Sequence, residues 1–486
     1  MLKNGAIYFV GRFGGAVVTL LSVAIYTRLL SPGEYGVYAL VLSGALMAYA
    51  GMMQWLTLAL ARFLPAYQGQ EEIILSHIAT AYGATAFLVL AGACVVALWF
   101  APSADTHTVL VLGVGIFLAM SLAELNLITF QMRGKAYRYI QYAILRVTVA
   151  AAIGVALAYL GWGSVGLLSG VIAGHLCIVL LNLPVTWGSV RRNLLRKQLF
   201  HELAAYGFPF AMTGTLAAII NASDRYIIGI LIGAEAAGLY AAPYDLAMRS
   251  LHVLMMVVAM AGNPIILRTY DADGEAAARP LIRRQVELLL GLALPAAIDY
   301  VILAPAIAEV FLGKAFQATA RELMPWIAAA TVLNGLQAFY LALAFSLPKH
   351  PLRQTYIFVS GTIVNVVLNF LLIPRMGLMG AALATVIAYA LILIGSFLTG
   401  RQLLPLPLPK ARLAQTLAAC TVWALILWPV HDTTALAPIF LHSLVGVVAY
   451  LAIFCGFGVG DTRRLMARAL HLVFGFMRPR RYGRKP

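Results

Sequence analysis

Apolar segments long enough to cross a membrane recur along the whole 486-residue chain. A helix spans the hydrocarbon core of a bilayer with about 20 predominantly apolar residues, and only 11% of the residues in this chain are charged. Soluble domains contain roughly 25% charged residues. We therefore predict an all-α polytopic membrane protein with fourteen transmembrane helices. The predicted spans are 5–28, 36–60, 73–100, 108–130, 138–160, 164–187, 203–231, 238–262, 281–303, 320–346, 353–373, 377–400, 412–430 and 437–459.

Lys and Arg residues are unevenly divided between the connecting segments. If the N-terminus lies in the cytoplasm, the cytoplasmic segments contain 26 of the 34 Lys and Arg residues, and the opposite face contains only Arg28, Lys314, Arg321 and Arg375. Such an excess of positive charge is typical of cytoplasmic loops, so we expect both termini in the cytoplasm. The net charge of +16 then reflects this bias and an attraction to anionic membrane lipids, with no binding to nucleic acid.

Two turns recur at similar spacings, which indicates an internal repeat. The segment LLSPGEYGVY at 29–38 is similar to LIGAEAAGLY at 231–240, and GSVG at 163–166 is similar to GLMG at 377–380. Each copy contains six spans, an even number, so we expect two six-helix lobes related by a pseudo-two-fold axis along the membrane normal. The alternative is that such turns recur by chance. The predicted parts are an N-terminal lobe at 1–190, a C-terminal lobe at 191–403, two extra spans at 404–460 and a basic cytoplasmic tail at 461–486.

Four charged side chains interrupt the apolar runs on either side of the turn at 233–238. Asp224 and Arg225 precede the turn, and Asp245 and Arg249 follow it. At 1.5 Å per residue, all four lie roughly 10–18 Å below the same membrane face. An ionisable residue at that depth costs on the order of 2.5–3.5 kcal/mol, so the group indicates a polar cavity inside the bundle. The alternative is two self-neutralising pairs, because Asp245 and Arg249 are spaced i, i+4 on one helix face.

Further charged residues lie inside other spans. Arg12, Glu124 and Arg146 lie roughly 10–12 Å from the cytoplasmic face, whereas Asp299 lies near the opposite face. Arginine is weakly hydrated and forms bidentate contacts, which suits phosphate. Alternatively, Arg12 and Arg146 extend to the headgroups, and Glu124 is a structural partner of Arg146. The predicted anion ligands at two levels are Arg12, Arg146, Arg225 and Arg249, and the candidate coupling or structural carboxylates are Glu124, Asp224, Asp245 and Asp299.

The sequence contains no recognisable catalytic or metal-binding motif. The four cysteines all lie in apolar runs without a CxxC pair, and there is no phosphate loop or aspartate-rich motif. We therefore predict no enzyme activity, catalytic residue, metal or cofactor, and leave open a coupling cation, either H⁺ or Na⁺. His175 and His252 lie within spans, where a histidine either relays protons or bonds a backbone carbonyl.

Several segments together resemble those of the polysaccharide transporter (O-antigen flippase) family of the multidrug/oligosaccharidyl-lipid/polysaccharide exporter superfamily. The resemblance covers nearly the whole chain and depends on the order and spacing of loose motifs. Those motifs are TRLLSPGEYGVY at 27–38, RFLP at 62–65, Asp224-Arg225 followed by Gly233 and GLY at 238–240, and GLMGAA at 377–382.

The resemblance implies a flippase that moves an undecaprenyl-diphosphate-linked oligosaccharide across the bacterial inner membrane by alternating access, for cell-surface polysaccharides such as O-antigen, lipopolysaccharide or exopolysaccharide. It implies basic diphosphate contacts in a central cavity, and polysaccharide polymerase machinery as a further partner. The family does not hold its cavity arginines at fixed positions, so Arg12, Arg146, Arg225 and Arg249 are candidates on depth alone. A cation-coupled multidrug exporter is the alternative within the superfamily, and a membrane glycan transferase or polymerase is the alternative outside it.

Overall fold

Helices account for nearly all of the structure, a computed structural model that describes residues 2–456 except 68, 101 and 102 and leaves out the side chains of residues 1–13 and of a few single positions. In this part of the chain, ten helices are long and apolar enough to cross a membrane, and an eleventh is formed by the bent pair Lys197–Pro209 and Gly214–Leu231. Two of the ten contain 52 and 69 residues, or roughly 78 and 104 Å at 1.5 Å per residue, enough for two crossings each. The prediction of an all-α multi-pass membrane protein is confirmed.

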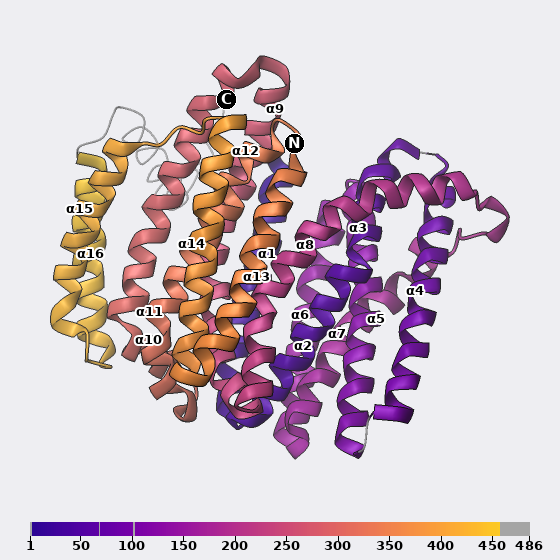
Figure 1. Cartoon of the computed structure of the whole chain (residues 1–486), viewed down its shortest axis with the longest axis horizontal. Helices are drawn as coiled ribbons and strands as arrows, with labels where there is room; N and C mark the ends of the chain where they lie inside the picture. Colours follow the sequence, from indigo (N-terminus) through magenta and orange to yellow (C-terminus); the bar gives the residue numbers. More distant parts are fainter. Residues whose placement is uncertain (1, 68, 101–102, 457–486) are drawn as a thin grey trace, which may run out of the picture.

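The helices of the first half are α1 (Leu2–Leu29), α2 (Pro32–Met52), α3 (Gln54–Phe63), α4 (Glu71–Phe100), α5 (Ala104–Met132), α6 (Ala136–Leu157) and α7 (Gly163–Trp187). Those that follow are α8 (Lys197–Leu231), α9 (Ala234–Ile302), α10 (Ala304–Phe311), α11 (Lys314–Leu336), α12 (Leu343–Ser346), α13 (Pro351–Met376), α14 (Leu378–Leu403), α15 (Lys410–Leu427) and α16 (Leu436–Gly456). In Figure 1, α2 to α7 lie on one side of the molecule, α1 and most of the second half lie in the centre, and the last two helices lie at the far edge.

Glycines with positive φ angles separate consecutive spans. Gly274 (φ 81°) interrupts α9 between the two predicted spans that this helix joins. Gly163 precedes α7 with φ 50° and ψ −131°, and Gly377 precedes α14 with φ 58° and ψ −138°. L-residues with a side chain rarely adopt this conformation. The two glycines occupy corresponding places in the predicted repeat and share nearly the same backbone angles.

The two halves meet closely where α2 and α9 begin. Ser31 caps α2, because its hydroxyl accepts a hydrogen bond from the Glu34 amide at 3.3 Å and the Glu34 carboxylate accepts one from the Ser31 amide at 3.0 Å. One turn later, a Cβ on Gly36 would lie 1.8 Å from the carbonyl oxygen of Ala234. A Cβ on Gly238 would likewise lie 2.0 Å from the carbonyl oxygen of Pro32. The repeated glycines therefore allow the two backbones to touch.

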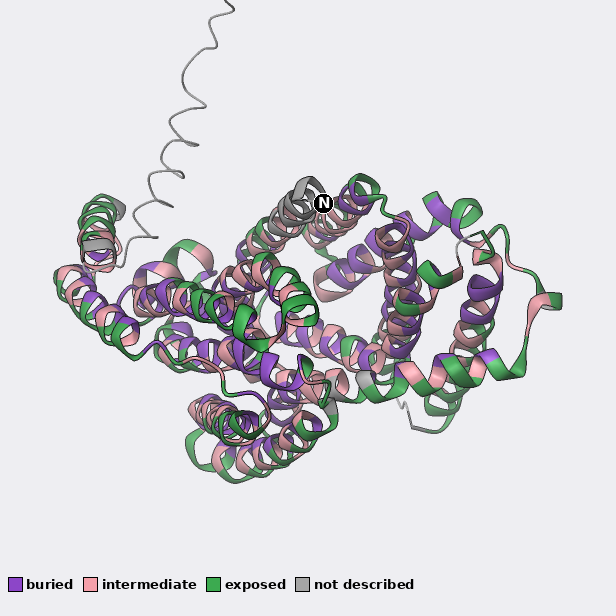
Figure 2. Ribbon diagram, turned by 90° about the horizontal axis from the view of Figure 1, so that it is seen from above, coloured by how far each residue is buried: buried purple, intermediate pink, exposed green. Residues whose placement is uncertain are grey.

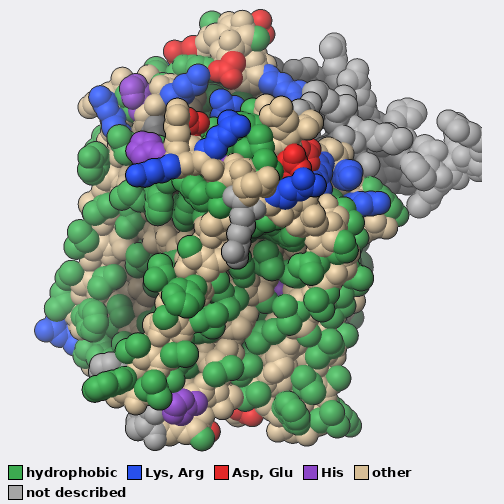
Figure 3. All heavy atoms as spheres, turned by 90° about the vertical axis from the view of Figure 1, so that its right-hand side faces the viewer, with side chains coloured by type: hydrophobic (Ala, Val, Ile, Leu, Met, Phe, Trp, Pro, Cys, Tyr) green, Lys and Arg blue, Asp and Glu red, His purple; other side chains and the backbone are tan. Residues whose placement is uncertain are grey.

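The outer surface of the bundle is apolar, as a surface in contact with lipid requires. On α4 the exposed side chains include Phe87 (70% exposed), Leu98 (82%) and Trp99 (79%). Viewed from above, buried residues concentrate on helix faces that meet other helices (Figure 2). Lys and Arg side chains gather at the end of the molecule where α1 begins and α16 ends, above a wide hydrophobic belt (Figure 3). This distribution follows the loop asymmetry in the sequence.

The two C-terminal helices pack on the end of α9. The Tyr450 hydroxyl of α16 donates to the Gly291 carbonyl of α9 at 2.7 Å, and the indole of Trp423 on α15 donates to the Asp299 carboxylate at 2.8 Å. Asp299 therefore faces α15. The predicted basic tail at 461–486 lies outside the described residues.

Candidate functional site

A buried ion pair links α8, α9 and α2. Nη2 of Arg225 lies 2.6 Å from Oδ1 of Asp245, and the two residues are 7% and 8% exposed. The Tyr35 hydroxyl donates to the other Asp245 oxygen at 3.0 Å, and Arg225 Nη1 donates to Ser43 at 3.2 Å. The Arg225 guanidinium also lies 5.3 Å from the ring centroid of Tyr244. The pair thus holds the second half of the chain to α2 of the first.

The alternative prediction, in which Asp245 pairs with Arg249, is therefore wrong about the partner. Asp245 bonds Arg225 on the neighbouring helix, although Arg249 is available four residues away on its own helix. Asp245 bonds Arg225 because the crossing of α8 and α9 brings the Arg225 guanidinium onto one oxygen of the Asp245 carboxylate. The other oxygen accepts from the Tyr35 hydroxyl. Arg249 is left without a hydrogen bond or ion pair to any described residue, and its Nε is buried.

Asp224, predicted as a partner of Arg225, is bonded to neutral donors instead. It is 1% exposed and accepts hydrogen bonds from Tyr240 at 2.9 Å, from Asn369 Nδ2 at 2.7 Å and from the Thr385 hydroxyl. Asn369, and Asn365 one turn before it, were not among the residues predicted from the sequence. The available signal was two amides at i, i+4 spacing inside an otherwise apolar run, which places both on one helix face.

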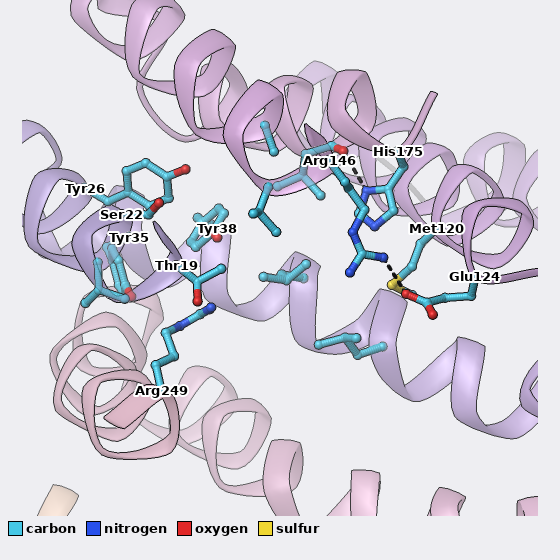
Figure 4. Close-up of a pocket in the computed structure, with 16 residues that line it drawn as sticks. Thr19, Ser22, Tyr26, Tyr35, Tyr38, Met120, Glu124, Arg146, His175 and Arg249 are labelled. Carbon is cyan, nitrogen blue, oxygen red and sulfur yellow. Dashed lines mark hydrogen bonds and ion pairs between the residues drawn. The ribbon is translucent and has the colours of Figure 1, made fainter. Parts of the chain in front are cut away.

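A pocket of about 270 Å³ lies between the first half of the chain and α9. Arg249 enters it from α9, while Arg146 of α6 and Glu124 of α5 lie on the other side (Figure 4). Its remaining lining comes from α1, α2, α5, α6 and α7. The polar and aromatic members of that lining are Thr19, Ser22, Tyr26, Tyr35, Tyr38 and His175. Arg146 and Arg249, which come from different halves of the chain, therefore line one small pocket.

Arg146 and Glu124 form an ion pair inside this pocket. Nη1 of Arg146 donates to Oε1 of Glu124, and the side chains are 21% and 34% exposed. Nδ1 of His175 lies 2.7 Å from the Val171 carbonyl, which is the backbone bond considered in the sequence analysis. His252 packs against the ring of Phe339 at 5.0 Å between centroids.

The remaining candidates whose side chains the structure describes do not line the pocket. Arg225 is held by Asp245, Asp224 faces α13 and α14, and Asp299 faces α15. Arg12 belongs to α1, but its side chain lies outside the described part of the structure. In that part, no group of three or more His, Cys, Asp or Glu side chains could hold a metal ion.

The pocket is suited to an anion. A guanidinium whose buried Nε has no partner among the described residues is costly in a low-dielectric environment, and an anionic ligand supplies what is missing. Arginine offers planar, bidentate donors that match phosphate oxygens. Tyr26 and Tyr38 line the same space, and their hydroxyl groups can donate to polar ligand atoms, whereas the Tyr35 hydroxyl already donates to Asp245.

The chain is similar to one protein family and to several solved structures. A model for the family described as "Polysaccharide biosynthesis protein" matches residues 25–321, and no curated protein matches the chain. Among solved structures, the lipid II flippase MurJ in an inward closed conformation gives a TM-score of 0.77 at 12% identity, covering 94% of this chain and 99% of that one.

Two further solved structures are multidrug/oligosaccharidyl-lipid/polysaccharide superfamily transporters. An inward-facing MATE family multidrug resistance transporter gives a TM-score of 0.59 at 14% identity, covering 80% of this chain and 94% of that chain. A transporter from Pyrococcus furiosus gives 0.59 at 14% identity, covering 82% and 95%. At these identities the likeness shows a shared fold.

Proposed function

The chain belongs to the polysaccharide biosynthesis protein family of this exporter superfamily, and we propose that it is a flippase for a lipid-linked oligosaccharide. The proposed substrate is an oligosaccharide on undecaprenyl diphosphate, moved from the cytoplasmic to the periplasmic leaflet of a bacterial inner membrane. The proposed mechanism is alternating access, in which the two halves rock around a central site. The product would serve cell-surface polysaccharide synthesis, with a polysaccharide polymerase as the acceptor of the flipped substrate.

The observation that carries this proposal is Arg249, which lines a pocket shared by both halves and has no hydrogen bond or ion pair to a described residue. A diphosphate has several anionic oxygens, and Arg249 and Arg146, which come from different halves of the chain, line the pocket in which we propose that it binds. A prenyl tail can stay in lipid while the glycan occupies the polar space. A lipid II flippase shares this fold.

The orientation in the membrane is part of the same proposal. The basic end of the molecule faces the cytoplasm by the positive-inside rule, so both termini are cytoplasmic and the turns before α2 and α9 are periplasmic. The crossing of Gly36 and Gly238 then lies on the periplasmic side of the pocket.

The pocket does not favour the multidrug exporter. A cationic drug needs an available carboxylate, whereas Glu124 in this pocket is paired with Arg146 and the group without a partner among the described residues is the cation Arg249. The charge available for a ligand is therefore positive.

Replacement of Arg249 tests the proposal. In cells that depend on this protein, Arg249→Gln should leave expression unchanged and reduce clearance of lipid-linked oligosaccharide from the inner leaflet at least tenfold, since loss of a charge-assisted contact costs roughly 1.5–3 kcal/mol. Arg375→Gln is the matched control, because Arg375 is an exposed arginine at the end of α13. Normal clearance by an Arg249→Gln protein at normal abundance would refute the assignment.

A further inference from the structure

We propose that Glu124 is a built-in competitor of the substrate diphosphate for Arg146, and that it promotes release after transport. This inference rests on the proposed function and concerns the regulation of the same site. The Glu124 carboxylate and the incoming diphosphate are both anions, and Arg146 has one guanidinium to offer. The free energy of the Glu124–Arg146 ion pair is therefore lost when the ligand binds Arg146, which lowers the affinity of the ligand.

The positions of the three charged groups give the competition a direction. Glu124 and Arg146 come from adjacent helices of the first half, α5 and α6, whereas Arg249 comes from α9 of the second half. A diphosphate that contacts both arginines bridges the two halves. When Glu124 forms its ion pair with Arg146 again, the ligand no longer bridges the halves and contacts only Arg249. Glu124 thus opposes a bound state that would hold the halves together.

The packing around Arg146 confines this exchange to side chains. A Cβ on Gly174 of α7 would lie 2.4 Å from the Arg146 carbonyl oxygen, so α6 and α7 are in backbone contact at this residue. The helix cannot carry Arg146 away from Glu124 without separating from α7. The side chains, in contrast, are 21% and 34% exposed toward the pocket and have room to exchange partners.

Binding of geranyl diphosphate, a short soluble prenyl diphosphate, to the full-length protein in nanodiscs tests the inference. Glu124→Gln removes the negative charge but keeps an oxygen that can accept from Arg146, so the fold should be retained. We expect about three- to fivefold tighter binding, the range that partly exposed ion pairs usually control, together with slower release. Glu124→Asp is the second variant, for use if Glu124→Gln folds poorly. Its carboxylate reaches less far toward Arg146, so it should also tighten binding.

Glu71→Gln is the matched control. Glu71 forms an ion pair with Arg133 at 2.7 Å, which also joins neighbouring helices, but neither residue lines the pocket. Its affinity should equal that of the unmodified protein. Unchanged or weaker binding by both Glu124 variants, or equal tightening in Glu71→Gln, would overturn the competitor role.

Arg249→Gln separates the two proposals. If it weakens binding of geranyl diphosphate at least tenfold while the Glu124 variants bind like the unmodified protein, the competitor role fails and the diphosphate site stands. If Arg249→Gln binds geranyl diphosphate as tightly as the unmodified protein, the diphosphate site itself is wrong.

Discussion

Alanine at Gly238 should force the two halves apart at the crossing of α2 and α9. In the structure the added Cβ would lie 2.0 Å from the Pro32 carbonyl oxygen, and the neighbouring Gly36 amide is 2.7 Å away. Both neighbours are backbone atoms, so a change of rotamer cannot relieve the contact. The closed arrangement of the periplasmic side should therefore be selectively destabilised.

The size of the effect follows from the missing space. An ordinary contact needs about 3.4 Å, so the helices must separate by about 1.4 Å at this point. Overpacking of this kind typically costs 1–3 kcal/mol. Because 1.4 kcal/mol is a factor of ten in an equilibrium, the closed state should become roughly 5- to 150-fold less populated relative to states with the halves apart.

Modification of a single cysteine measures this shift. In a cysteine-free background, Ser22→Cys places a thiol in the pocket lining, and a membrane-impermeant reagent is added from the periplasmic side. Gly238→Ala should raise the modification rate at least fivefold. Gly33→Ala is the control, because Gly33 lies in the first turn of α2, next to Pro32, and its Cβ would have nothing within 4 Å. Equal rates in the two variants would refute the proposed closure at this crossing.

Three further predictions follow from the same structure. A cysteine at Ala234 should react with an impermeant reagent in intact spheroplasts, and labelling that needs permeabilisation would contradict the proposed orientation. Asp245→Asn should lower the free energy of unfolding of the purified protein by about 3–5 kcal/mol, because it leaves Arg225 buried and uncompensated. The double variant Asp245→Leu with Arg225→Met should recover most of that loss, and an equally unstable double variant would contradict this. Asp224→Asn should cost about 1–3 kcal/mol in the same assay, because one amide oxygen cannot accept from the three donors that the carboxylate satisfies, and an unchanged melting temperature would contradict it.

The sequence alone predicted the features that depend on local chemistry. Span length and apolarity located the helices, because both depend on residues that are neighbours in the chain. The repeated turns identified Gly36 and Gly238 as equivalent residues, but the contact between their backbones joins residues far apart in the chain and was not predicted.

Partner choice among the buried charges could not be predicted in this way. Within α9 the i, i+4 spacing allows Asp245 to bond Arg249, but the crossing of α8 and α9 gives it Arg225. Asp299 faces α15 for a related reason. A helix that is apolar all round has no polar face to show which side meets which neighbour, so the sequence did not predict the direction that each charged side chain faces.

Reconstitution of the purified protein with a labelled undecaprenyl-diphosphate oligosaccharide tests the central claim most directly. The measurement is the rate at which the glycan becomes accessible on the opposite leaflet of proteoliposomes. The unmodified protein and Arg375→Gln should move the lipid-linked glycan at similar rates, and Arg249→Gln should move it at least tenfold more slowly. Equal rates for Arg249→Gln and the unmodified protein, or no movement of the lipid-linked glycan by the unmodified protein, would contradict the account.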